Sequence, residues 1–186
     1  LIAINKNFNF QNRKLFFFKQ REQLQFEIKE IDRTSWKYFS KYHYLSERLP
    51  GGKLYLYGLF YNGNQIGFQC FANYVPYTES EKLKKRKIIY HSNRTVIHPD
   101  YNGLGLGIKL INKTSELLLK KINCRIMAKF SSAPVYKAMI KQDVWKYLGF
   151  KRRFGKLRFG GGSKMNRKTG QREKGIKTYN FEYIIQ

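Results

Sequence analysis

The chain is short of acidic residues. Its 186 residues include 12 Asp and Glu against 37 Lys and Arg, a formal net charge of +25. A small domain usually carries a net charge of about 2–8, and a large excess of one sign destabilises the compact state unless an anionic partner relieves the repulsion. An AT-rich genome would favour lysine codons but does not explain the shortage of carboxylates. We therefore expect a polyanionic partner, with nucleic acid ahead of an acidic membrane surface.

Cysteine, histidine and long apolar runs are also scarce. The two cysteines, Cys70 and Cys124, are too few for a disulfide framework or a cysteine zinc site, and both lie in apolar runs, which predicts buried free thiols. Such thiols favour a reducing, cytoplasmic location. The three histidines lack metal-binding spacing, so no metal is predicted. No apolar run approaches the roughly 20 residues that span a bilayer, and the first residues lack a signal-peptide core, so no membrane partner is predicted.

The distribution of charge predicts three parts. Residues 1–21 form a basic N-terminal arm, residues 22–150 a folded core, and residues 151–186 a basic extension that ends in a strand. Residues 151–178 alone contain 11 Lys and Arg against one Glu, so that segment carries 11 − 1 = +10. We expect the arm and the extension to contact DNA or RNA, which implies a nucleoid or nucleoprotein association.

Strands and helices alternate along the predicted core. Period-two alternation predicts a strand near residues 24–28, and Thr34 or Ser35 is expected to cap a helix that runs to about residue 45. Asn62-Gly63 suits the tight turn of a hairpin. The remaining predicted elements are the hairpin strands 54–60 and 66–72, a strand at 88–97, an amphipathic helix after residue 107, a strand at 123–130, a short helix at 135–141, a core-closing segment at 145–150 and a strand at 178–185.

A glycine-rich loop is the strongest functional signal. Residues 97–107 read Ile-His-Pro-Asp-Tyr-Asn-Gly-Leu-Gly-Leu-Gly, between a predicted strand and a predicted helix. Glycines let the backbone approach a ligand, and the amides at a helix N-terminus favour an anion such as pyrophosphate. The spacing fits neither a Walker loop nor a dinucleotide-binding fingerprint. The plain alternative is a glycine-rich turn without a ligand.

With Ile97, Pro99 and the glycines in place, the sequence resembles the GNAT acetyltransferase superfamily. The resemblance implies an α/β fold, with a mixed, mostly antiparallel sheet and helices on both faces. It also implies acetyl-CoA, or another acyl-CoA, as co-substrate. Asn102 stands where the family usually has Arg or Gln. The residues expected to bind the co-substrate are Ile97, Asn102, Gly103, Leu104, Gly105, Leu106, Gly107 and Ile108.

The proton chemistry departs from the family pattern. GNAT enzymes often have a Glu on the strand before the loop, but residues 88–97 contain no carboxylate. His91 on that strand and His43 after the first helix are the candidate bases, because imidazole titrates near neutral pH. For each, a hydrogen-bonded structural role is the alternative, and His98 is expected in solvent. Trp145 occupies the place of the family's Tyr acid, so Tyr147 is the candidate acid.

A narrower resemblance concerns the acceptor. The segment His43-Tyr44-Leu45-Ser46 and the region from Ser132 to Ala138 resemble the phage Mom family, GNAT-like enzymes that modify adenine in DNA. GNAT domains fused to ABC-type ATPases are similar in the first segment and in the intact loop. The residues expected to contact the acceptor are Tyr44, Arg94, Ser132 and Tyr136.

The sequence therefore predicts an acyl-CoA-dependent N-acyltransferase that acts on nucleic acid or on a nucleic-acid-associated acceptor. Two alternatives stay open at this point. One is a Mom-like enzyme that modifies DNA adenine, and the other is a non-catalytic GNAT-fold component of a nucleoprotein assembly.

Overall fold

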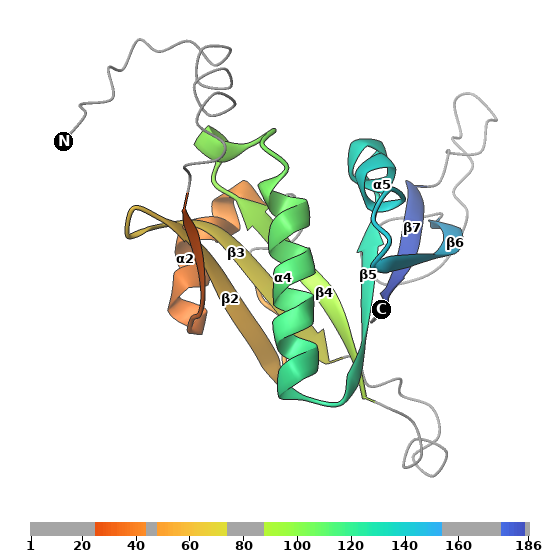
Figure 1. The fold of residues 1–186 in the computed structure, drawn as a ribbon, viewed down its shortest axis with the longest axis horizontal. Coiled ribbons are helices and arrows are strands. Elements are labelled where there is room, and N and C mark those ends of the chain that lie inside the picture. Colours follow the sequence, from red (N-terminus) through yellow and green to blue (C-terminus); the bar gives the residue numbers. More distant parts are fainter. Residues whose placement is uncertain (1–24, 44–47, 74–87, 154–175, 185–186) are drawn as a thin grey trace, which may run out of the picture. The chain divides into compact units, whose positions relative to one another are not determined.

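The computed structural model describes residues 25–43, 48–73, 88–153 and 176–184. These ranges hold seven strands in one sheet of order β1-β2-β3-β4-β5-β7-β6 (Figure 1). The pairs β1–β2, β2–β3, β5–β7 and β6–β7 are antiparallel, whereas β4 and β5 run parallel. The elements are β1 (Phe26–Glu30), α2 (Trp36–Phe39), β2 (Leu54–Tyr61), β3 (Asn64–Asn73), β4 (Ile88–Ile97), α4 (Leu106–Lys121), β5 (Cys124–Phe130), α5 (Ala133–Met139), β6 (Trp145–Arg153) and β7 (Ile176–Tyr183). The predicted α/β class with a mixed, mostly antiparallel sheet is confirmed.

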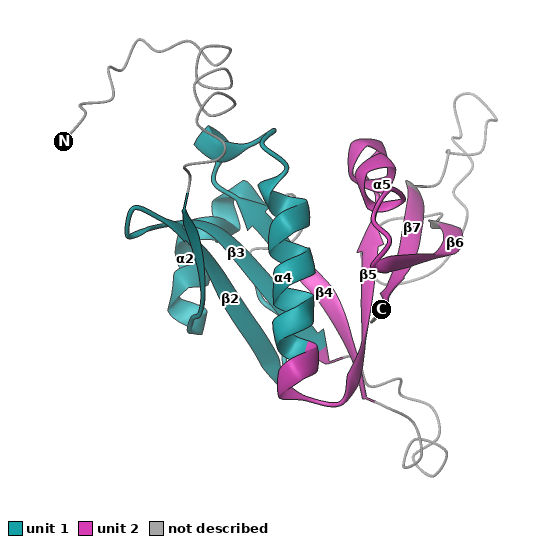
Figure 2. Cartoon of the chain, in the orientation of Figure 1, with its two compact units in different colours: residues 1–72, 94–118 teal, residues 73–93, 119–186 magenta. Residues whose placement is uncertain are grey.

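The chain divides into two compact units (Figure 2). Unit 1 comprises residues 1–72 and 94–118, and unit 2 comprises residues 73–93 and 119–186. Both β4 and α4 therefore pass from one unit into the other. The glycine loop belongs to unit 1, whereas α5, β6 and β7 belong to unit 2.

The predicted hairpin is confirmed in unit 1. Asn62 has φ 48° and Gly63 has φ 74°, and Asn62 is the only non-glycine residue with positive φ in the described ranges. Two consecutive positive φ values give a turn whose twist matches that of the flanking strands. The pairing of β2 with β3 shifts register between Leu59 and Phe60, so the hairpin contains a bulge.

Helices cover both faces of the sheet within unit 1. On one face, Trp36 and Phe39 of α2 pack in a cluster with Phe68 of β3 and Val96 of β4. The adjacent residue Gly67 faces the other way, because a Cβ there would lie 3.3 Å from a Leu110 methyl group of α4. Alternate residues of a strand point to opposite faces, so α2 and α4 lie on opposite sides.

The first helix is shorter than predicted. Residues 33–42 form a 3₁₀ turn, the single turn α2 and a second 3₁₀ turn, and His43 is already extended at φ −100° and ψ 128°. Asp32 caps the first 3₁₀ turn, because its carboxylate accepts the Thr34 amide at 2.7 Å, whereas Ser35 precedes α2 at its N-cap position without a side-chain hydrogen bond. Asp is among the best N-cap residues, and here its carboxylate reaches the backbone two positions on.

In unit 2 the last strand begins two residues earlier than predicted and lies inside the sheet. β7 pairs with β5 through Met127–Phe130 and with β6 through positions 145–153. Residue 150, where the predicted core ends, therefore falls within β6. The basic arm at 1–21, Tyr44 and the segment 154–175 lie outside the described residues.

The cysteines behave as the sequence predicts. Cys70 and Cys124 are both free and buried, and burial raises the pKa of the Cys70 thiol to about 12. In the described ranges, no three His, Cys, Asp or Glu side chains are grouped to hold a metal ion. No helix in those ranges has the length and apolar content that crossing a bilayer requires.

Candidate functional site

The glycine loop joins β4 to α4 in unit 1. A 3₁₀ turn at Pro99–Tyr101 follows His98, and Asn102 is then extended at φ −68° and ψ 150°. Gly103 and Gly105 have φ values of 82° and 74°, which L side chains rarely adopt. A Cβ at Gly105 would meet nothing within 4 Å, so space is open above this residue. The two glycines are thus required by the backbone conformation of the loop.

The loop ends at the N-terminus of a 16-residue helix. The Gly105 carbonyl accepts the Lys109 amide at 3.2 Å, so the amides of Leu106, Gly107 and Ile108 have no acceptor within the helix. The first turn of α4 has no acidic residue. Amides without an acceptor in the helix and the helix dipole together favour an anion at this end. The residues predicted to hold a pyrophosphate are therefore contiguous here, with Ile97 packed against the base of the helix.

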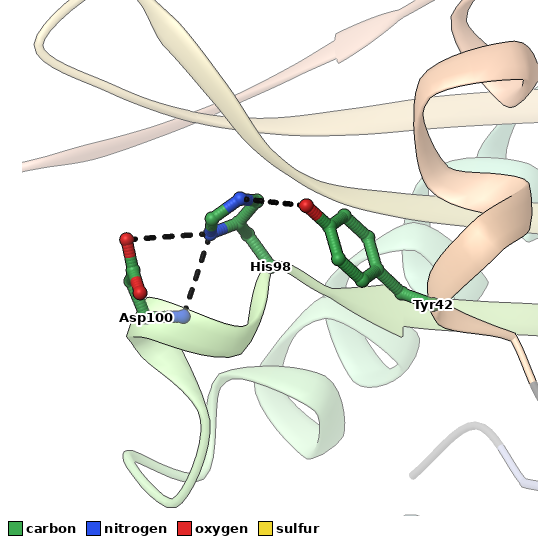
Figure 3. Close-up of polar contacts among 3 residues, drawn as sticks. All are labelled: Tyr42, His98 and Asp100. Carbon is green, nitrogen blue, oxygen red and sulfur yellow. Dashed lines mark hydrogen bonds and ion pairs between the residues drawn. The ribbon is translucent and has the colours of Figure 1, made fainter.

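His98 does not lie free in solvent, contrary to the sequence expectation. Its side chain is only 20% exposed and contacts polar groups of two residues, Tyr42 and Asp100 (Figure 3). Nε2 lies 3.3 Å from the Tyr42 hydroxyl, and Nδ1 accepts the Asp100 amide at 3.4 Å, with a carboxylate oxygen of Asp100 at 3.8 Å. The Tyr42 hydroxyl can donate to Nε2 or accept from it, so this hydrogen bond forms with either tautomer of His98. His98 also donates its backbone amide to the Ile66 carbonyl at 2.8 Å, so the start of the loop is held from two sides.

Aromatic rings surround His98. The Tyr38 ring stacks on the imidazole with 5.9 Å between centroids and 9° between planes, and Tyr101 contacts it edge-on. Sequence reasoning missed Tyr38 and Tyr42 as contributors to the loop. Their four-residue spacing in a predicted helix, away from the Trp36 and Phe39 face, was the available signal.

The structure brings His43 and Arg94 together in unit 1. Burial, and then the nearby Arg94 charge, lower the pKa of His43 to about 4. The His43 ring contacts Trp36 edge-on at 5.8 Å, and Arg94, which is 8% exposed, donates to the Arg48 carbonyl at 3.3 Å. At neutral pH, His43 is therefore an uncharged acceptor beside a cation.

His91 lies in unit 2, on the part of β4 that pairs with β5. It is in register with Met127, and burial, followed by the Lys129 charge, lowers its pKa to about 4. His91 is thus also neutral at pH 7. Both candidate bases can accept a hydrogen bond, but each holds a proton weakly.

Tyr147 and Tyr136, a candidate acid and a candidate acceptor contact, meet in unit 2. Their rings are 5.4 Å apart, and Tyr136 also stacks on Tyr179 at 4.0 Å. Burial and the two neighbouring tyrosines raise the pKa of Tyr147. Ser132 is the N-cap of α5, and its Oγ accepts the Val135 amide at 3.5 Å. Trp145, in the position of the family's Tyr acid, is buried.

No protein-family model and no curated protein matches the chain. Solved structures do match its fold. The ribosomal-protein-S18-alanine N-acetyltransferase of Escherichia coli aligns with a TM-score of 0.57 at 12% identity, covering 87% of this chain and 96% of that one. A GNAT-family acetyltransferase of Streptococcus pneumoniae gives 0.56 at 13%, covering 87% and 100%. A Bacillus subtilis acetyltransferase solved with CoA gives 0.54 at 10%, covering 88% and 99%. The chain therefore has the GNAT fold.

Proposed function

We propose that this chain is an acyl-CoA-dependent N-acyltransferase whose acceptor amine belongs to nucleic acid or to a molecule carried by it. The observation that carries the proposal is the loop at Gly103 and Gly105, which leads into the first amides of α4, which have no acceptor within the helix. The fold supports it, because solved structures with this fold are acetyltransferases. The narrower resemblance to the Mom family stays a sequence prediction.

The loop fits the diphosphate of a CoA thioester. Gly105 leaves open space above the backbone, and the amides of Leu106, Gly107 and Ile108 supply donors without a carboxylate in the first turn. A diphosphate there would receive hydrogen bonds that the helix itself cannot use. When bound, the thioester supplies an activated acyl group. Tyr42 and His98 would contribute indirectly, by fixing the start of the loop.

If His43 or His91 is the base, its low pKa favours one kind of acceptor amine over another. An alkylamine is protonated at pH 7, and a base with a pKa of about 4 removes its proton poorly. His43 and His91 both have pKa values of about 4. An exocyclic amine of a nucleobase is already neutral at pH 7 and needs only a hydrogen-bond acceptor as it loses its proton after attack. The weak bases therefore favour a nucleobase amine over a lysine or an N-terminus.

A non-catalytic role is the second candidate, and one observation favours it. Trp145 replaces the family's Tyr acid and is buried, so it cannot donate a proton to a leaving thiolate. Tyr147, the remaining candidate, has a raised pKa and is therefore a weaker acid than a free tyrosine. Mass analysis of nucleosides after incubation with acetyl-CoA separates the two roles, since only an enzyme leaves an added acyl mass.

The substitution Gly105→Glu tests the co-substrate site. The new side chain would enter the open space above the loop and place a negative charge where the diphosphate should lie. We expect the wild type to bind acetyl-CoA in calorimetry and the variant to lose at least about tenfold in affinity, roughly 1.4 kcal/mol, from repulsion and strain.

Gly63→Glu is the matched control. Gly63 also has φ 74° and no atom within 4 Å of an added Cβ, but it lies in the β2–β3 turn. The same backbone strain should therefore leave acetyl-CoA binding unchanged there. Absence of heat with the wild type, or equal losses in both variants, would remove the glycine loop as the co-substrate site.

A further inference from the structure

A bulge in β6 places two aromatic residues on one face of the sheet in unit 2. Tyr147 pairs with Phe181 and Phe150 pairs with Tyr179, so Leu148 and Gly149 together oppose Asn180. Gly149 has φ 98°, and its carbonyl accepts the Asn180 side-chain amide at 3.2 Å. Residues three apart in a regular strand point to opposite faces, and the extra residue brings Tyr147 and Phe150 to the same one.

Part of this face is covered, and part is open. Tyr136 of α5 covers the inner part by stacking on Tyr179 at 4.0 Å and by contacting Tyr147 and Phe181. Phe150, next to Tyr179 across the strands, is 48% exposed. Phe150 therefore presents about half of its surface to solvent at the outer part of this face, beside the stacked tyrosines.

A cation accompanies the exposed ring. The Lys177 ammonium lies 4.1 Å from the Phe150 ring centroid and 5.1 Å from that of Tyr179. Lys151, next to Phe150 in the strand, pairs with Thr178 and falls on the opposite face. Glu182 is one residue from Phe181 and so also lies on the opposite face, where it pairs with Arg125 at 2.6 Å. The charge beside the aromatic surface is therefore the positive charge of Lys177.

We propose that Phe150, Tyr179 and Lys177 form a platform for single-stranded nucleic acid. An unpaired base stacks on Phe150, and the Lys177 ammonium moves from the ring face to its rim, where it meets the adjoining phosphate. Stacking needs an exposed base face, which a paired duplex does not offer. The Lys177 charge at the rings and the net charge of +25 match a polyanion better than an apolar peptide or a second copy of this chain. The proposal rests on the proposed nucleic-acid acceptor and states how it is held.

The experiment compares two probes of equal length and charge by fluorescence anisotropy. One is a short oligothymidylate, and the other is the same backbone without bases. We expect the full-length wild type to prefer the probe with bases. Phe150→Ala should weaken oligothymidylate binding by about fivefold to 150-fold, the range for loss of one stacked base, and should leave the abasic probe unaffected. Phe150→Trp should keep the preference, because it keeps an aromatic face.

Lys177→Gln should act differently from Phe150→Ala. It removes a phosphate contact, so it should weaken both probes and lower the log–log salt slope by about 0.7. Ile140→Ala is the matched control, since Ile140 is 49% exposed in the same unit but lies at the end of α5. A parallel titration with oligoribouridylate shows whether the chain prefers RNA or DNA. Binding of either strand more tightly than the abasic probe supports the platform.

Three results would overturn the platform. The first is equal binding of both probes by the wild type, and the second is the same effect of Phe150→Ala and Ile140→Ala on binding. The third is sedimentation that shows dissociation of a dimer by Phe150→Ala, which would make this face an interface between two copies of the chain. Acetyl-CoA calorimetry on Phe150→Ala keeps the two proposals separate. That variant should bind acetyl-CoA as the wild type does. If the wild type does not bind acetyl-CoA, the proposed transferase is contradicted, but the comparison of the two oligonucleotide probes still tests the platform.

Discussion

At the residue scale, the two histidines with lowered pKa values couple stability to pH. His43 and His91 both have pKa values of about 4 in the folded chain, against an ordinary value of 6.5, with burial as the main cause. Between pH 6.5 and about 4, the unfolded chain therefore binds more protons than the folded chain. The neutral histidines favour the fold above pH 6.5, and this contribution is lost as the pH falls.

We expect the urea midpoint to fall as the pH drops from 7 to 4.5, and to fall less in the double variant His43→Gln/His91→Gln. Both side chains are partly exposed, so solvent screening reduces the effect below that of a fully buried histidine. Titration of the imidazole proton resonances gives the two pKa values directly. Ordinary values near 6.5, or a double variant with an unchanged pH profile, would contradict the prediction.

Also at this scale, the Tyr42 hydroxyl is expected to support the glycine loop through His98. Tyr42→Phe keeps the ring and removes that partner, so acetyl-CoA affinity should fall by about twofold to tenfold, the range for one hydrogen bond. Tyr38→Phe is the control, because Tyr38 contacts His98 through its ring. Calorimetry provides the affinities, and thermal unfolding should be nearly unchanged in both. Equal affinities for the two variants would show that the hydroxyl does not position the loop.

At the element scale, the sequence predicts the hairpin turn, the glycine loop and α4, because their conformations depend on residues close together in the chain. Asn62-Gly63 fixes the hairpin, and Gly103 and Gly105 fix the loop before α4, because each position needs a positive φ that few residues adopt. The amphipathic period of α4 likewise marks its buried face. These elements, and the conformation of the glycine loop among the candidate sites, can therefore be predicted from residues close together in the sequence.

Other features depend on pairing between distant segments. The position of β7 between β5 and β6 follows from cross-strand packing of Phe181 with Phe130 and Tyr147, which no single segment shows. The bulge at Gly149 needs a partner strand to become visible. The contact of Tyr42 with His98 joins residues 56 positions apart, which is why sequence reasoning left His98 in solvent. Tertiary context decides each of these.

At the scale of the whole molecule, the net charge of +25 is the basis of the predicted polyanionic partner. In the described ranges, several carboxylates already face cations, as Glu116 does with Lys113 and Glu182 with Arg125. Even if every carboxylate of the chain paired with a cation, most of the Lys and Arg side chains would have no carboxylate to neutralise them. A deletion of residues 151–178 cannot test their role, because it would remove the end of β6 and the start of β7, which pair at Arg153 and Ile176.

Charge replacement in residues 154–175 tests the partner without breaking the sheet. This segment contains seven Lys and Arg against one Glu, and the variant changes the seven to Gln. Duplex binding should weaken steeply with salt in the wild type, and the variant should lose up to about 0.9 of log–log slope for each cation that contacts a phosphate. Titrations of duplex DNA and RNA at several salt concentrations measure the slopes.

A second variant controls for net charge. It changes three lysines of α4 to Gln, namely Lys113, Lys120 and Lys121. If binding follows net charge alone, both variants lose the same slope per cation removed, and the segment has no special role. If residues 154–175 contact the nucleic-acid backbone, their variant loses more log–log slope per cation removed than the α4 variant does. Its affinity for acetyl-CoA stays unchanged, because the glycine loop is intact.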